Sequence, residues 1–144
     1  MDTLETQIAD LLGEQAERYR TLRRILLRQT ACLRRDDVTG VGAATAEIRE
    51  TVAQAAELEA RLGPLVERWR SRGAAGDDRI PEMAREMAET VAGLQDLRAQ
   101  NEGLAREAMD RRRQEMVQLN AGVQAVRGYT PRPQGRARFV DRVK

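Results

Sequence analysis

The chain has 144 residues, the length of one ordinary domain, which leaves no room for a second large core. Aromatic residues make up 3% of it and charged residues 33%, a composition typical of long helices and coiled coils and unlike that of a β-sandwich or barrel. The formal net charge is +2, but residues 127 to 144 hold six basic groups and one acidic group. The tail therefore carries +5, and residues 1 to 126 carry −3.

The chemical groups that most enzymes need are scarce in this sequence. It has no His, one Cys, one Ser and one Lys. General acid–base catalysis at neutral pH favours His, and a Ser or Cys nucleophile needs a base beside it. Two carboxylate pairs, Asp36-Asp37 and Asp77-Asp78, stand beside Gly-containing loops, where Asp commonly caps the next helix. We therefore expect no enzyme, no metal site and no cofactor.

A first helix is predicted from Ile8 to Leu33. Positions 8, 12, 15, 19, 22, 26, 29 and 33 are separated by alternating steps of four and three, and six of the eight are apolar or aromatic. Gln15 and Gln29 interrupt this seam, where polar residues commonly set the register between helices. Further apolar residues widen the seam into a face that needs more than one neighbouring helix. These residues are Leu4, Leu11, Ile25 and Leu27.

The stretch from Arg34 to Gly42 is predicted to end the first helix, because Gly40 and Gly42 break its pattern, and a second amphipathic helix is predicted to begin near Val41. Its apolar residues recur at steps averaging near 3.5 as far as Trp69, which we expect to pack at the end of a bundle. Gly63-Pro64 falls inside this helix. An internal proline loses a hydrogen bond and costs about 3 kcal/mol, so we expect a kink or a break there.

A third helix is predicted from about residue 81 to residue 127, which is roughly 70 Å if it is unbroken. Its apolar seam runs through Leu94, Leu97 and Leu104 and shifts phase at Arg111-Arg112-Arg113. Such a shift turns the following segment toward a different neighbour. The apolar positions after the shift are Met116, Leu119, Val123 and Val126.

These segments predict an all-α fold, an antiparallel bundle of three long helices with coiled-coil-like packing and a second helix that can kink at Gly63-Pro64. We expect a helical bundle domain over residues 1 to 127. Residues 128 to 144 contain Pro131, Pro133 and Gly135 among alternating Arg residues, which predicts a flexible, extended basic tail.

The order and spacing of these residues resemble the FlgN family, cytoplasmic export chaperones that hold the hook-filament junction proteins of the bacterial flagellum before secretion. The similarity covers the whole chain, from residues 11 to 22 of the first helix to an aromatic residue and a glycine after the last. The residues that carry it after the first helix are Leu33, Leu58, Glu59, Arg61, Leu65, Val66, Leu94, Leu97, Asn101, Leu104, Tyr129 and Gly135.

The resemblance implies a chaperone that binds the C-terminal helical regions of hook-associated proteins, keeps them unassembled and delivers them to the export gate. The client-binding positions are then Met116, Leu119, Val123 and Val126. The gate component FlhA recognises such chaperones partly through a C-terminal aromatic residue, and Tyr129 matches that position. A homodimer is a further partner that the sequence allows, because apolar faces of this width close equally well within one chain or between two.

Two other functions are compatible with parts of the sequence. A structural coiled-coil scaffold needs only the apolar seams, and nucleic-acid binding needs only the basic tail. The acidic body and the lack of a recognition helix argue against nucleic acid as a partner. A single Cys, the absence of a signal-peptide pattern and the lack of a long apolar run predict a cytoplasmic protein without membrane insertion.

Overall fold

A computed structural model describes residues 2–73 and 78–129, and these residues form three α-helices and no strand. The helices are α1 (Thr3–Arg34), α2 (Val38–Ser71) and α3 (Arg79–Tyr129). The predicted all-α class and its three long helices are confirmed. The predicted extended tail falls almost wholly on residues 130–144, which lie outside the described residues.

The first turn of α1 is held by Asp2. Its carboxylate accepts a hydrogen bond from the Glu5 backbone N–H at 2.9 Å, and the Glu5 side chain accepts one from the Asp2 N–H, which completes a capping box. Arg72, the C-cap of α2, forms an ion pair with the same carboxylate. The Glu5 N–H and the Arg72 guanidinium together lower the pKa of Asp2 below its ordinary value. This pair ties the start of α1 to the end of α2.

The turn between α1 and α2 is shorter than the sequence suggests. Asp36 adopts a left-handed conformation with φ 54°, which Asp tolerates better than most residues, and Asp37 caps α2 by accepting from the Gly40 N–H at 2.9 Å. Gly40 and Gly42 therefore lie inside α2, and the prediction that they lie between the helices is wrong. Packing against α1 favours glycine at position 40, because a Cβ there would lie 2.7 Å from Cys32 Sγ.

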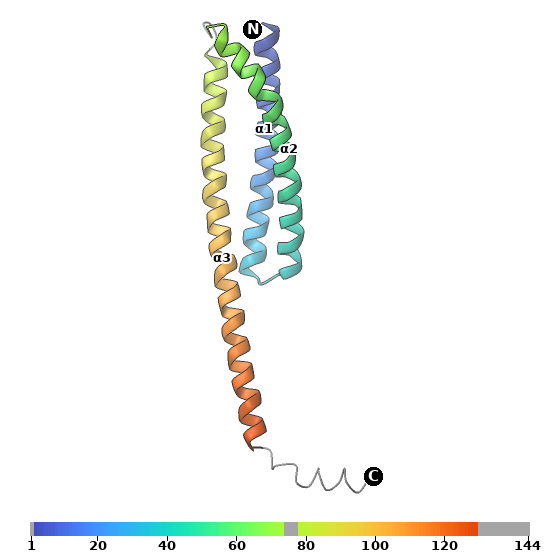
Figure 1. Cartoon of the computed structure of the whole chain (residues 1–144), viewed down its shortest axis with the longest axis vertical. Coiled ribbons are helices and arrows are strands. Elements are labelled where there is room, and N and C mark those ends of the chain that lie inside the picture. Colours follow the sequence, from blue (N-terminus) through green and yellow to red (C-terminus); the bar gives the residue numbers. More distant parts are fainter. Residues whose placement is uncertain (1, 74–77, 130–144) are drawn as a thin grey trace, which may run out of the picture. The chain divides into compact units, whose positions relative to one another are not determined.

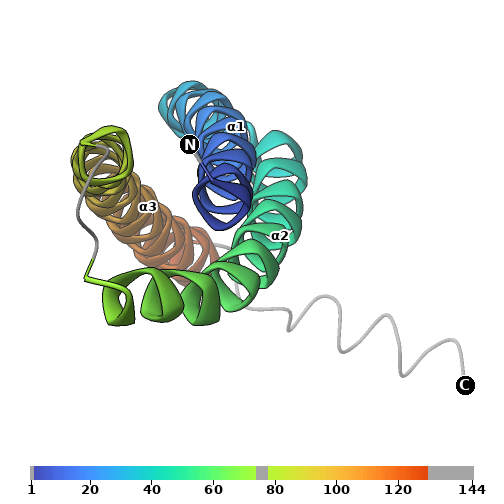
Figure 2. The same cartoon turned by 90° about the horizontal axis from the view of Figure 1, so that it is seen from above.

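Helix α2 continues through Gly63-Pro64 to Ser71, so the break considered for this site is wrong, while the kink stays a prediction. In Figure 2 the last turns of α2 cross the end of the bundle toward the start of α3. This course brings the end of α2 near the N-terminal end of α1 (Figure 1). Trp69 packs there with Leu4 and Ile8.

Two clusters of buried side chains hold α1, α2 and the first part of α3 together. One lies at the N-terminal end of α1, where Trp69 packs as expected at the bundle end, and its buried members are Leu4, Ile8, Leu12, Trp69 and Ile80. The other lies further along α1 and joins Leu22 and Leu26 to Leu94 of α3. Met83 and Met87 pack against the first cluster as partly buried fillers.

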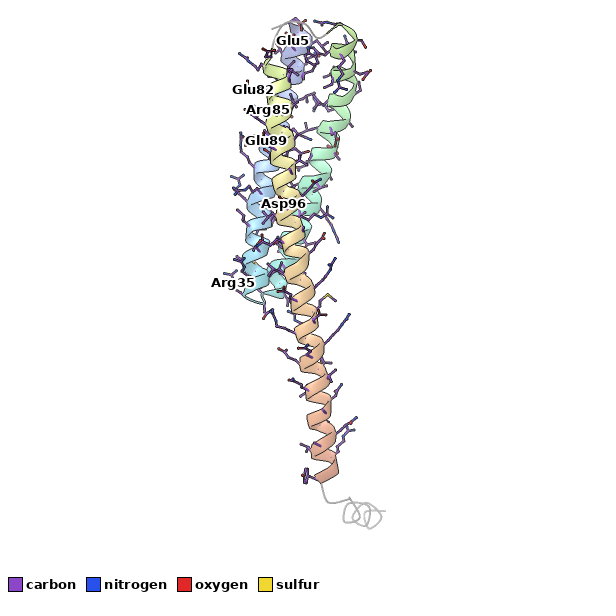
Figure 3. All side chains as sticks on the ribbon, turned by 90° about the vertical axis from the view of Figure 1, so that its left-hand side faces the viewer. Glu5, Arg35, Glu82, Arg85, Glu89 and Asp96 are labelled. Carbon is purple, nitrogen blue, oxygen red and sulfur yellow. The ribbon has the colours of Figure 1, made fainter. Side chains whose placement is uncertain are left out.

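The outward face of α3 near its start carries charges spaced for ion pairs along one helix. Arg85 lies 3.4 Å from Glu89 and 4.0 Å from Glu82, and the three residues follow one another along the face shown in Figure 3. Exposed pairs of this kind contribute only a few tenths of a kcal/mol each, about 0.3–0.5 in a helix. They mark this face as solvated.

The chain divides into two compact units, residues 1–105 and residues 106–144. The first unit holds α1, α2 and α3 as far as Ala105, and in it α1 and α2 run antiparallel beside each other (Figure 1). The Cα atoms of α1 and α2 approach within 8 Å, and α3 contacts α1 through the side chains of Leu94 and Asn101. The predicted division into residues 1 to 127 and 128 to 144 stays a prediction.

Candidate protein-binding surfaces

The second unit presents an apolar strip on the last part of α3. Every described residue from 109 to 129 is exposed. The sequence-predicted client residues Met116, Leu119, Val123 and Val126, here called the α3 stripe, are between 42% and 67% exposed. Steps of three, four and three place them on one face of the helix. A row of large apolar side chains this accessible to solvent commonly marks an interaction site, so the stripe is a candidate binding surface.

Tyr129 is the last residue of α3, and its side chain is 90% exposed. An aromatic ring with a hydroxyl suits a binding contact, because its body is apolar and its tip forms hydrogen bonds in water or at an interface.

The flanks of the α3 stripe carry mainly positive charge. Arg111, Arg113 and Arg127 lie on its two sides, with Glu115 as the acidic residue among them, and all four are exposed. Arg111-Arg112-Arg113 forms part of a solvated face. A helix that covers this stripe therefore meets guanidinium groups at its edges, which favours acidic residues there.

A second surface lies in the first unit and was not anticipated from the sequence. A groove of about 580 Å³, here called the bundle groove, opens between α1, α2 and α3. Its walls are residues 19 to 33 of α1, 41 to 52 of α2 and 91 to 105 of α3. Apolar residues that line it include Leu22, Leu26, Leu33, Ile48, Val52 and Leu94.

A polar network at the bundle groove joins all three helices. Asn101 of α3 is 3% exposed and donates from Nδ2 to the Leu26 carbonyl and to Gln29 Oε1, both at 2.9 Å. Its Oδ1 lies 2.5 Å from the Thr30 hydroxyl, and Gln29 Nε2 donates to Thr45 Oγ1 of α2 at 3.2 Å. Of the two Gln residues that interrupt the seam of the first helix, Gln29 thus bonds across helices, to Asn101 and to Thr45. Gln15, by contrast, bonds only to Tyr19 of its own helix among the described residues.

Asn101→Ala should lower the free energy of unfolding by about 1–3 kcal/mol, because Gln29 Oε1 loses its donor and a buried group is left unsatisfied. Urea unfolding followed by circular dichroism measures the change. Gln100→Ala, at the exposed neighbouring position, should change stability by less than about 0.5 kcal/mol. Equal unfolding midpoints for the two variants would contradict a structural role for the network.

The residues that the structure describes contain no cluster of side chains that could hold a metal ion. None of the described helices combines the length and the apolar character required to cross a bilayer.

Comparison with protein families matches residues 1–136 of the chain to the family model described as FlgN protein. The matched range contains both the bundle groove and the α3 stripe. No curated protein matches the chain, and no solved structure matches it.

Proposed function

Because this chain belongs to the FlgN family, whose members are flagellar export chaperones, we propose that it binds hook-associated proteins through the α3 stripe. In this proposal the chain acts in the cytoplasm, keeps its clients unassembled and delivers them to the export gate. The family is one of chaperones rather than of enzymes.

The exposure of the α3 stripe is the observation that supports the proposal. Four apolar residues at helical spacing offer the anchors that an amphipathic client helix needs for helix-to-helix recognition. Such a contact would shield the stripe of the chaperone and the apolar face of the client from other partners. A client covered in this way cannot pair with its assembly neighbours through the same face.

Tyr129 is proposed to contact the export gate component FlhA. Its position at the end of α3 and its exposed ring keep it accessible while the α3 stripe is occupied, since it lies outside the four stripe residues. An aromatic side chain buries a large area at a small cost in conformational entropy, which suits a brief docking contact.

Titration calorimetry with a purified hook-associated protein tests the proposed function. We expect a saturable complex with the intact client and loss of measurable binding when the C-terminal helical region of the client is deleted. A hook subunit without that region serves as the control. Equal affinity for the intact and deleted clients would overturn the proposal.

A further inference from the structure

The bundle groove has the length of a short helix. At 1.5 Å per residue its α2 wall, residues 41 to 52, is about 16 Å long, and its α3 wall, residues 91 to 105, is about 21 Å long. Three helices of an antiparallel bundle leave a lateral opening that a fourth amphipathic helix fills in four-helix bundles. The bundle groove lies at such a lateral position, with one wall from each of the three helices.

The polar network around Asn101 is satisfied within the chain and needs no hydrogen bond from a ligand. Asn101 and Gln29 are hydrogen-bonded to each other, and their remaining bonds go to Leu26, Thr30 and Thr45. Because these groups are already satisfied within the chain, the face of the occupant that enters the groove should be apolar.

The charges at the rim of the groove indicate which charge a bound helix should carry beside its apolar face. Arg98 and Glu102 of α3 form an ion pair at 3.3 Å and so neutralise each other. Arg49 of α2 also lines the groove but forms no ion pair with any residue that the structure describes. A carboxylate beside the apolar face of the occupant would complement the Arg49 guanidinium.

We propose that the bundle groove binds an amphipathic helix of the exported client that carries an acidic residue beside its apolar face. This inference rests on the proposed function and adds a second binding surface to it. The α3 stripe of a second copy fits the groove less well, since its flanking residues Arg113 and Arg127 would meet Arg49. Like charges placed together at an interface oppose association.

A fluorescence experiment tests which surface the client covers. In a Cys32→Ala background, a polarity-sensitive dye is attached at Val52→Cys in the groove or at Val123→Cys in the stripe, and the purified hook-associated protein is added. We expect a blue shift of the emission from both positions. Glu50→Cys, on an exposed part of α2 outside the groove, should show no shift.

The pattern of shifts separates the two proposals. A shift at position 123 without one at position 52 would overturn the groove proposal and leave the proposed function standing. No binding of the client and no shift at either position would overturn the proposed function itself. In the absence of client, the labelled chain can also be titrated with unlabelled chaperone. A blue shift at position 52 that grows with the chaperone concentration would identify a second copy as the occupant and would overturn the groove proposal.

Charge reversal at Arg49 tests the acidic edge of the client helix. Arg49→Glu should slow client association at low ionic strength by roughly tenfold, and the difference should disappear in about 1 M salt, where the screening length is about 3 Å. Arg49→Lys should retain the wild-type rate. Arg61→Glu makes the same charge change at an exposed α2 position outside the groove and should have a smaller effect. Equal slowing by the two reversals would show that only net charge matters and would overturn the assigned contact.

Discussion

Leu119→Asp should abolish client capture while leaving the free energy of unfolding almost unchanged. The Leu119 side chain is 62% exposed, so its removal leaves no cavity in the core. In the complex the same position would bury a carboxylate without a partner, and the loss of one apolar anchor alone commonly costs about 2 kcal/mol or more of binding energy. We therefore expect the dissociation constant to rise by at least about 30-fold.

Gln118→Asp provides the matched control, since it adds the same charge at an exposed neighbouring position that points away from the α3 stripe. Thermal melts of both variants should overlap with that of the wild-type chain, and calorimetry with the hook-associated client should separate them. If Leu119→Asp unfolds the chain, or binds the client as tightly as Gln118→Asp does, the client site lies elsewhere.

The extent of the helices could be predicted from local patterns, because helical periodicity is a property of neighbouring residues. The third helix was expected from residue 81 to residue 127 and runs from Arg79 to Tyr129. The start of α2 was misplaced for a local reason as well. The Asp37 side chain caps the helix before the glycines, so Gly40 and Gly42 fall in its first turns, where the backbone is already held.

The distance between helices could not be predicted, since periodicity identifies the apolar face of a helix but not how closely a neighbour approaches. Leu97 was placed in the core with Leu94, yet it is only partly buried, and Leu27 is 44% exposed although it was assigned to the interior face. The exposed fraction of each side chain depends on how far the neighbouring helix covers it, which periodicity does not specify. The bundle groove likewise depends on how three helices sit together, so it could not be predicted from the periodicity of each helix.

The polar seam residues show what a sequence pattern can and cannot specify. Asn101, Gln15 and Gln29 each interrupt an apolar seam in the same way. Only in three dimensions does Asn101 reach Gln29 across two helices, while Gln15 bonds within α1 to Tyr19. The pattern therefore identifies buried polar positions, but the partner of each depends on the register between helices.

Ile8→Ala should cause a large loss of stability, about 2–5 kcal/mol. Ile8 is fully buried, with 0% exposure, in the cluster that joins the start of α1 to Trp69 of α2 and Ile80 of α3. Truncation removes apolar area and leaves a cavity, and two of its neighbours come from other helices whose backbones cannot easily collapse into the space. Urea unfolding of the wild-type and variant chains measures the difference.

Leu27→Ala is the appropriate control for this loss, because Leu27 lies on the same helix but is 44% exposed, and its removal should cost less than about 1 kcal/mol. Trp69 fluorescence reports urea unfolding at this end of the bundle, since Trp69 belongs to the cluster that Ile8→Ala weakens. Unfolding followed by this fluorescence should shift to lower urea concentration in Ile8→Ala and remain near the wild-type midpoint in Leu27→Ala. If both substitutions shift the midpoint equally, α1 does not pack against α2 and α3 through the cluster around Ile8, and the arrangement of the bundle end is wrong.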